Sequence, residues 1–444
     1  MRIVTKVAAA MQAVFGRTLD DLARNTGCVQ RQRKFSGMSL MRMLVLPLLH
    51  RPAAKDRDYR AMAAKLGVHV TEEAIAQRFT KGLPQFLAEG LKQAVAQTLA
   101  AKPVPGALLR KFTDVRIGDS TTLTLPDEFA DQFPGCGGTG KACRAALKIQ
   151  VLWSLTTGRL LKWLLEPGRA SDAISPIAAA VPPAGSLSIF DLGYFSLERF
   201  QRVAEANAHW ISRFQHNTKV FDRAGKQLSL LRFLRKHGKR GLVDVSVVLG
   251  EKERLPCRLI AVRVPPEMAA RRRQQIREKA RDHGRQPSQE YLDLQEWTIF
   301  ITNCPPELLS WKEVVVLYRA RWQIELLFKL WKSHNRLAER DTEAAPQRQM
   351  AVLYAKLIGV LVQHWILLTA TWSDGKRSLR KAAVIVRDWI VLISDALNDR
   401  RRLHHLLYRL QNAIAETARV TSRRKHPSLF QLLENPELLE YTVR

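Results

Sequence analysis

The chain has 444 residues, 46% of them hydrophobic, so it is long enough for two or three folded domains and is no basic tail. Its formal net charge of +30 exceeds what solubility requires and predicts a polyanionic partner. Nucleic acid is the usual partner of so basic a protein, and an anionic membrane is the alternative. Five scattered cysteines without a C-x-x-C pair argue against a zinc site. Their odd number fits the reducing cytoplasm, where we expect the protein to reside.

Two segments bear on the membrane alternative. The N-terminus, residues 1–16, has basic residues but only a short, interrupted apolar run, so we expect no signal peptide. Residues 351–372 are long and apolar, but they contain Lys356, Gln363 and His364. We therefore predict a buried bundle helix there and no membrane span.

Residues 1–105 have helical periodicity, and within them 58–80 has the rhythm of a helix-turn-helix. Gly67 breaks a first helix, and Thr71 is placed to cap a second helix that would carry Gln77 and Arg78. These two side chains are candidate DNA contacts, although helix–glycine–helix patterns also occur in bundles that bind nothing. Upstream, the basic stretch 24–37 either follows a phosphate backbone or is a solvated linker.

The pattern changes to strands after the proline- and glycine-containing stretch 101–109. Alternating or short apolar runs predict strands over 114–125, over two segments of 147–168 joined at Thr157 and Gly158, over 186–190, and over 208–214. Residues 216–296 combine strand-like pieces with a very basic stretch at 271–285, and we predict an inserted subdomain. Residues 297–303 predict a strand that returns to the first sheet, and 345–444 are helical and basic.

Three acidic residues stand out against these elements. Asp119 lies within a strand-like run, Asp191 ends an apolar strand, and Glu325 lies on the helix after the returning strand. A carboxylate within or at the end of an apolar strand is unfavourable unless something compensates its charge. Either aspartate alone would be read as a cap or turn residue. Three such groups brought together could hold Mg²⁺, with Mn²⁺ as a substitute, through hard oxygen ligands. Two ions of this kind support phosphoryl transfer.

The helix that carries Glu325 has an unusual polar edge. At about 100° per residue, the side chains of one narrow stripe fall within about 60° of Tyr318. They are Tyr318, Arg321, Glu325, Lys329 and Lys332. A surface helix with i,i+4 ion pairs would explain the stripe without function. Alternatively, the cations keep the carboxylate ionised and bind the phosphates of a nucleic-acid strand.

These residues resemble the Y-x2-R-x3-E-x6-K signature of bacterial insertion-sequence transposases of the DDE type, insertion-sequence family four. Tyr318, Arg321, Glu325 and Lys332 match it at every spacing. The stretches "IGDSTTLTLP" and "IFDLGYFS" resemble the family's first and second aspartate motifs. Leu192 departs from the family, in which many members have arginine after the second aspartate, so a local phosphate contact or ion pair is in doubt.

The resemblance implies a mixed α/β fold. A ribonuclease H-like core would carry an inserted β-rich subdomain and be flanked by helical domains. The expected parts are a DNA-binding domain (1–105), the first part of the core (106–215), the insertion (216–296), the second part of the core with the glutamate helix (297–344), and a C-terminal helical domain (345–444).

The resemblance also implies cut-and-paste transposition of a DNA segment through nicking, hairpin formation, hairpin opening and strand transfer. Asp119, Asp191 and Glu325 would hold two Mg²⁺ ions. Tyr318, Arg321, Lys329 and Lys332 would bind phosphates near the cut. The partners would be double-stranded transposon ends and target DNA, bound by a dimer.

Two further residues carry over from the family by spacing. Trp297 stands where the family has a tryptophan that stacks on a flipped base, and a core residue that opens a strand is the alternative. Arg213 stands where the family has an arginine that contacts the DNA end, and a surface cation on an edge strand is the alternative.

The glycine-rich stretch 133–142 lacks the full phosphate-loop pattern because Ala142 follows Lys141. We interpret it as a flexible hairpin loop and expect no nucleotide cofactor. Two other functions remain open for the whole chain. A silent DNA-binding protein or repressor would share its charge and its helix-turn-helix. A structure-specific nuclease would share its carboxylates but would need neither a base-stacking tryptophan nor a large insertion.

Overall fold

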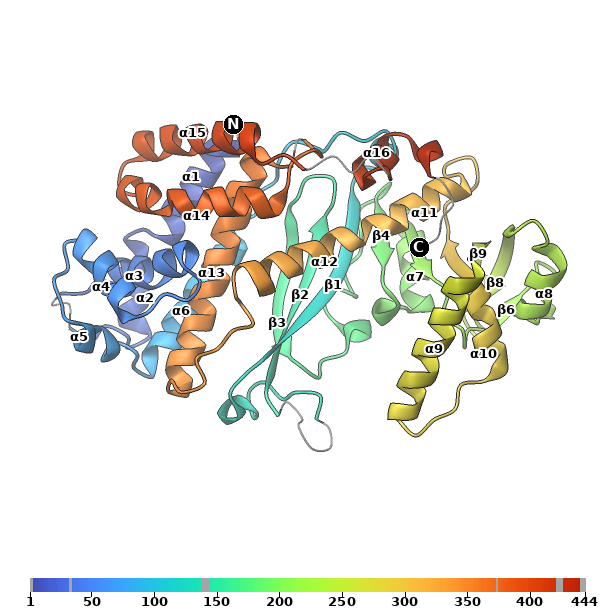
Figure 1. Cartoon of the computed structure of the whole chain (residues 1–444), viewed down its shortest axis with the longest axis horizontal. Helices are drawn as coiled ribbons and strands as arrows, with labels where there is room; N and C mark the ends of the chain where they lie inside the picture. Colours follow the sequence, from blue (N-terminus) through green and yellow to red (C-terminus); the bar gives the residue numbers. More distant parts are fainter. Residues whose placement is uncertain (1–2, 32–33, 138–143, 373, 421–425, 440–444) are drawn as a thin grey trace.

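The computed structural model describes residues 3–31, 34–137, 144–372, 374–420 and 426–439. Within this part of the chain, one large twisted sheet occupies the centre, and a bundle of helices from both ends of the chain lies at one side of it (Figure 1). Residues 138–142, the second half of the glycine-rich stretch 133–142, lie outside the described residues. The molecule is of the mixed α/β class, as the sequence predicts.

The sheet has ten strands in the order β3-β2-β1-β4-β5-β10-β9-β8-β6-β7. They are β1 (Val115–Thr124), β2 (Ala146–Ser154), β3 (Leu160–Pro167), β4 (Leu187–Phe190), β5 (His209–Arg213), β6 (Val220–Phe221), β7 (Gln227–Leu228), β8 (Leu242–Leu249), β9 (Leu255–Arg263) and β10 (Trp297–Thr302). All the strands that the sequence predicts are present to within a few residues.

Strand directions divide the sheet. Strands β1, β2 and β3 are antiparallel neighbours, whereas β1, β4 and β5 run parallel. Strand β10 is antiparallel to both β5 and β9, which confirms that 297–303 returns to the first sheet. The strands of the predicted insertion, 216–296, therefore extend the same sheet beyond β10. Their backbone hydrogen bonds are continuous with those of the preceding strands.

Burial follows the position of each strand in the sheet. Strands β4 and β10 lie in the middle and are buried at every residue, which accounts for their unbroken apolar or small composition. Strand β1 is buried at Val115, Ile117 and Gly118 but is partly exposed at Asp119 and Ser120, in the middle of its length. Polar atoms thus reach solvent at one point near the centre of the sheet.

The basic stretch at 271–285 is mostly helix, which the sequence does not predict. It forms most of α9 (Pro266–Asp282), whose only buried residue is Ala269. Arg272 and Arg273 anchor this helix by hydrogen bonds to Thr298 and Glu296, next to the start of β10. The absence of an apolar stripe explains why periodicity does not reveal this helix.

Helices from both ends of the chain form one bundle around α13 (Pro346–Ala370), which packs against α1, α3, α6, α14 and α15. Those five are α1 (Ile3–Val14), α3 (Gly37–His50), α6 (Gly82–Ala96), α14 (Leu379–Ala396) and α15 (Arg400–Thr417). Helix α13 is long and apolar enough to cross a membrane, but 89% of its most apolar window is buried. It is therefore a bundle helix, as the sequence predicts.

The segment with helix-turn-helix rhythm forms α4 (Asp56–Lys65) and α5 (Glu72–Ala76). Gly67 between them has φ +78°, and the Thr71 side chain caps α5 by accepting a hydrogen bond from the Ala74 amide. Helix α5 ends at Ala76, so the expectation that Gln77 and Arg78 lie on it is wrong, and both residues are exposed just beyond its end.

The helix predicted over 318–332 is part of a nearly continuous rod. It consists of α11 (Trp311–Ala320), α12 (Trp322–Lys329) and the π-helical turn η6 (Leu330–His334) (Figure 1). The rod begins with a capping box formed by Ser310 and Glu313. Along its length it passes from the region of β10 to the helical bundle.

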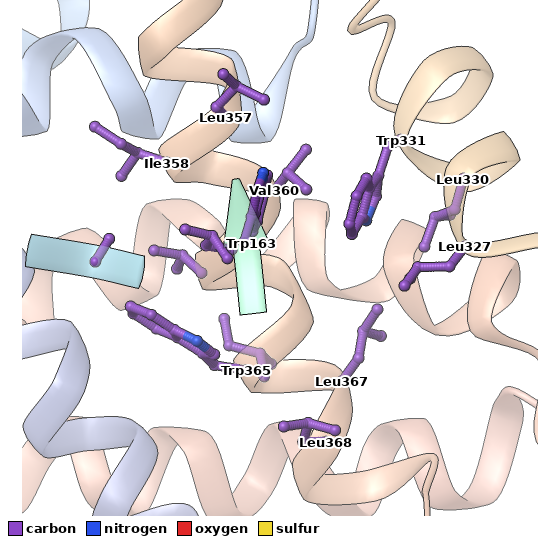
Figure 2. Close-up of a cluster of buried hydrophobic side chains, with 14 of the residues drawn as sticks. Trp163, Leu327, Leu330, Trp331, Leu357, Ile358, Val360, Trp365, Leu367 and Leu368 are labelled. Carbon is purple, nitrogen blue, oxygen red and sulfur yellow. The ribbon is translucent and has the colours of Figure 1, made fainter. Parts of the chain in front are cut away.

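Trp331 ties the end of this rod to the sheet and the bundle. Its ring stacks on Trp163 of β3, with centroids 5.0 Å apart and planes 7° from parallel. Figure 2 shows this pair among Leu327, Leu330 and apolar side chains of α13. Trp331 is 1% exposed. The stacking on Trp163 and the contacts with α13 fix the position of Trp331. Packing therefore sets the rotation of the rod about its own axis, and hence the direction of its polar edge.

The remaining helices are short. They are α2 (Thr18–Asn25), α7 (Leu197–Glu205), α8 (Leu230–His237), α10 (Gln289–Asp293) and α16 (Leu429–Glu434), with 3₁₀ turns η1 (Leu109–Lys111), η2 (Asp127–Phe129), η3 (Asp172–Ile174), η4 (Leu192–Tyr194), η5 (Leu294–Glu296) and η7 (Pro436–Leu438). Helix α16 packs on α11.

We predict that Trp331→Ala lowers the free energy of unfolding by about 3–5 kcal/mol, because it removes a fully packed indole. Trp322→Ala is the matched control, since Trp322 is on the same rod but is 57% exposed, and we expect it to change stability little. Denaturant unfolding followed by circular dichroism measures both. Equal losses for the two variants would contradict the packing role of Trp331.

Candidate active site

Strand register brings the two aspartates together. Gly118 of β1 pairs with Phe190 at the end of β4, and the two strands are parallel. The next residue of each strand is Asp119 and Asp191, respectively, so these two lie side by side. Asp191 is the first residue after β4, where the chain turns into η4. Two residues 72 positions apart in sequence thus lie next to each other on neighbouring interior strands, where β4 ends.

Glu325 joins them from above the sheet. Helix α12 packs on β1, and Arg321 and Glu325 lie one helical turn apart on the side that faces the two aspartates. The side chain of Asp119 is 16% exposed, that of Glu325 is 33% exposed and that of Asp191 is 41% exposed. The structure therefore brings together all three carboxylates that the sequence predicts to converge.

A single guanidinium contacts all three carboxylates. Arg321 Nη2 is 2.5 Å from Glu325 Oε1, Nη1 is 3.4 Å from Asp119 Oδ2, and Nε is 3.7 Å from Asp191 Oδ1. Burial alone would lower the pKa of Arg321, but the surrounding acids and Tyr318 raise it above its ordinary value. Arg321 consequently stays charged and offsets much of the repulsion among the acids.

Asp119 has the most strongly perturbed environment of the three. Burial raises its pKa to about 6, and the neighbouring charges of Asp191 and Glu325 act in the same direction. The Ser120 amide, 2.8 Å from Asp119 Oδ1, and Arg321 oppose this rise. The carboxyl is thus ionised at neutral pH, although less readily than an exposed aspartate.

The three acids and Arg321 line an open hollow of about 470 Å³, together with Ser120, Phe328, Lys329, Lys332 and Ser333. Lys329 and Lys332 come from the same polar edge as Glu325, as the sequence predicts. They place two further cations beside the carboxylates. The hollow thus combines a cluster of acids with cations at its wall, the arrangement expected for a site that handles a phosphate backbone.

Tyr318 and Arg213 lie behind this hollow and do not line it. Tyr318 packs edge-on against Phe300 of β10, and the Arg213 guanidinium lies over the same ring, 5.6 Å from its centroid. Burial raises the pKa of Tyr318 to about 12, with Asp191 acting in the same direction, so its phenol keeps its proton. Tyr318 and Arg213 thus lie near the hollow but do not contribute to its wall.

Trp297 is 2% exposed and is not among the residues that line the hollow. The Arg263 guanidinium covers one face, 4.8 Å from the ring centroid, and the backbone of Gly238 approaches so closely that a Cβ there would lie 2.3 Å from the indole. This environment fits the alternative that Trp297 opens a core strand. A base could stack on it only after Arg263 or Gly238 moved.

Gln77 and Arg78 belong to the helical bundle and do not line the hollow. Arg78 lies over the ring of Phe35, 5.3 Å from its centroid. The structure therefore presents them as exposed groups of a separate surface.

Sequence reasoning misses a supporting group beside Asp191. Arg199 of α7 is 2% exposed and donates to the backbone carbonyls of Ala173, Ala178 and Tyr194. It thereby joins η3 to η4, the turn that follows Asp191. Arg199 lies on an amphipathic helix, in which the sequence does not distinguish a buried arginine from an exposed one.

Asp172 is a second supporting group that sequence reasoning misses. It accepts a hydrogen bond from the Ser120 hydroxyl and forms an ion pair with Lys148 at 3.1 Å. Asp172 follows a turn and resembles an ordinary surface acid in the sequence. These contacts fix the backbone next to Asp119.

The donor set fits a hard divalent cation, because three carboxylates from separate elements share one cationic partner. Within the described ranges, no three His, Cys, Asp or Glu side chains already enclose a position for a metal ion. The carboxylates surround the Arg321 guanidinium instead. A metal ion could therefore bind all three acids only if these side chains rearranged around it.

The chain is similar to bacterial insertion-sequence transposases. The family model described as "Transposase DDE domain" matches residues 110–358, which include all three acids. The transposase for insertion sequence element IS231F of Bacillus thuringiensis subsp. israelensis is 25% identical, with 94% of this chain and 92% of the relative aligned. The transposase for IS1151 of Clostridium perfringens is 26% identical over 67% of each chain. The transposase for IS421 of Escherichia coli is 27% identical over 78% of this chain and 89% of its own length.

We predict that Trp297→Ala lowers the free energy of unfolding by about 3–5 kcal/mol, as expected for a buried core tryptophan. Trp311→Ala is a comparison on the first turn of α11, where the indole is only partly buried. Urea unfolding measures both variants. Wild-type stability in Trp297→Ala would show that the ring is dispensable for packing and would favour a role in binding a base.

Proposed function

Because the chain belongs to the family of bacterial insertion-sequence transposases with a DDE domain, we propose that it carries out cut-and-paste transposition. Its relatives fit insertion-sequence family four. The observation that carries the proposal is the convergence of Asp119, Asp191 and Glu325, from β1, β4 and α12, on one hollow with cationic walls. A protein that only coats DNA has no need of this cluster.

In the proposed reaction, Asp119, Asp191 and Glu325 hold two Mg²⁺ ions, for which Mn²⁺ can substitute. Such ions, when bound, stabilise both the attacking and the leaving oxygen of a phosphoryl transfer. The protein contributes the position of the ligands. Arg199 holds the turn after Asp191, and Asp172 and Ser120 hold the backbone beside Asp119.

The cations bind and orient the DNA strand. Lys329 and Lys332 line the hollow and are placed for phosphates of the strand to be cut. Arg321 offers a planar fork that suits bidentate contact with one phosphate. Tyr318 keeps its proton and can donate a hydrogen bond, and Arg213 adds charge at the DNA end. Gln77 and Arg78 would contact DNA from the helical bundle.

The same carboxylate site would serve four successive steps. Water first attacks a phosphodiester at the transposon end and releases a 3′-OH. This hydroxyl attacks the opposite strand, expelling the flanking DNA and closing a hairpin. A second water opens the hairpin, and the 3′-OH then attacks target DNA. In each step an oxygen nucleophile forms one P–O bond as another breaks. Stacking of a flipped base on Trp297 during hairpin formation would require Arg263 to leave the ring.

We further propose that β1 to β5 and β10 are the ribonuclease H-like core, with 216–296 as its insertion. Two observations support this assignment. Strand β1 has an antiparallel neighbour, β2, and a parallel neighbour, β4, and the two aspartates lie within β1 and directly after β4. The helical parts, 1–105 and 345–444, would bind the transposon ends. Since two ends must be held together, the working complex is a dimer on DNA.

The deciding experiment uses duplexes that carry the inverted repeats flanking the coding region, incubated with the protein and Mg²⁺. Joining of a pre-cleaved end to target DNA supports a transposase. Cutting without joining would indicate a structure-specific nuclease. A mobility shift without any chemistry would indicate a DNA-binding protein or repressor that has lost catalysis.

We predict that Asp119→Asn reduces strand cleavage by about 10³-fold or more, because a lost ligand removes several kcal/mol of transition-state stabilisation. DNA binding should persist, since the basic groups are unchanged. Asp127→Asn, on the exposed turn η2 after the same strand, is the matched control and should cleave normally. If Asp119→Asn loses binding and cleavage together, Asp119 is a structural residue.

We predict that the affinity for DNA falls steeply with salt, with a log–log slope of magnitude about 5 or more, as for a protein that contacts at least six phosphates. Lys332→Gln should reduce the slope by about 1. Lys219→Gln should leave it unchanged, because Lys219 lies just before β6 in the inserted segment and pairs with Glu251 at 2.6 Å. Fluorescence anisotropy over a range of KCl concentrations measures each slope, and a flat plot would contradict DNA as the main partner.

A further inference from the structure

We infer that Arg321 occupies the carboxylate cluster as an internal cation in the DNA-free protein, and that DNA phosphate must draw it away before divalent metal ions bind tightly. The inference rests on the proposed function, because it assigns to Arg321 a role in metal loading at the proposed site. It makes metal binding conditional on DNA and so goes beyond a simple phosphate contact.

The geometry of the guanidinium is the first argument. Each acid is paired with a different nitrogen of the guanidinium, Glu325 at 2.5 Å, Asp119 at 3.4 Å and Asp191 at 3.7 Å. The Arg321 side chain is only 16% exposed. A group so placed takes up the shared space among the ligands, which is the space that a metal bound to all three would need.

The other cations of the hollow do not share this position. Lys329 and Lys332 line the same hollow. Among the described residues, the ion pairs of Asp119, Asp191 and Glu325 are all with Arg321. The choice of Arg321 is therefore a matter of position and not of charge alone.

The guanidinium and a metal ion would compete for the same carboxylate oxygens, although the net charge still attracts a cation. Three carboxylates and one guanidinium carry a net charge of minus two. A divalent ion placed among the same oxygens would lie within a few ångströms of the guanidinium, where like charges repel strongly in a partly buried site. We therefore expect tight metal binding to displace Arg321 from its observed contacts with the acids.

DNA offers Arg321 an alternative partner. A phosphate presents two oxygens to the planar fork of arginine, much as a carboxylate does. A strand lying along Lys329 and Lys332 would place such phosphates at the mouth of the hollow. Because linkage is reciprocal, DNA that removes Arg321 from the acids tightens metal binding, and metal tightens DNA binding by the same factor.

The first test measures Mn²⁺ binding without DNA, by electron paramagnetic resonance, in wild type, Arg321→Gln and Lys332→Gln. We expect Arg321→Gln to bind Mn²⁺ at least about tenfold more tightly than wild type, a typical coupling between sites. Lys332→Gln should differ little from wild type. Equal affinities in wild type and Arg321→Gln, or equal gains in both variants, would overturn the inference.

Thermal unfolding gives a second readout that does not depend on activity. Arg321→Gln should unfold at a lower temperature than wild type without metal, because three acids lose their partner. Mn²⁺ should then raise its midpoint more than it raises that of wild type. A larger effect of Mn²⁺ on wild type would contradict the inference. If Arg321→Gln does not fold, Arg321→Lys serves instead, since one ammonium reaches fewer of the acids and should bind Mn²⁺ more tightly than wild type.

The role of DNA is tested by repeating the Mn²⁺ titration with a duplex of the flanking inverted repeat. The duplex should tighten Mn²⁺ binding about tenfold in wild type but little in Arg321→Gln. An unchanged wild-type affinity would refute the DNA-dependent step. Failure of every protein to bind Mn²⁺, with or without DNA, would instead refute the metal site and with it the proposed function.

Discussion

Bringing Asp119, Asp191 and Glu325 to one point is unfavourable by itself. Like charges repel, and the two aspartates belong to or follow buried strands, where an ionised carboxylate is poorly solvated. The fold meets this by placing a guanidinium from the same helix among them. Folding and the proposed catalysis therefore require different cations at the same three carboxylates. Arg321, which offsets the repulsion among the acids, lies where a divalent cation would bind in the proposed function.

Distant elements keep that geometry in place. Trp331 stacks on Trp163 and fixes the rotation of the rod on which Arg321 and Glu325 lie (Figure 2). Buried Arg199 holds the turn after Asp191 through backbone carbonyls. These contacts hold the elements that carry the acids, as a preorganised site requires.

Local patterns in the sequence predict much of this structure. Alternation identifies the strands, and the polar edge on the rod identifies the side of Glu325. Three features depend on tertiary contacts and escape such reasoning. Helix α9 lacks an apolar stripe, the burial of Trp297 arises from Arg263 and Gly238, and the joining of the two terminal helical regions depends on packing around α13. The resemblance to the family predicts that Asp119 and Asp191 converge, whereas local patterns alone do not give the parallel register that places them side by side.

The position of β10 has a consequence for how the chain acquires its structure. This strand is the last of the ten in sequence, yet it lies between β5 and β9 in the sheet. Until residues 297–302 are in place, both neighbours expose backbone edges that invite pairing with other molecules. Sheet closure over so many intervening residues is intrinsically slow. During synthesis, intermediates with two open edges should therefore persist, and slower translation or lower temperature should favour recovery of folded enzyme over aggregates.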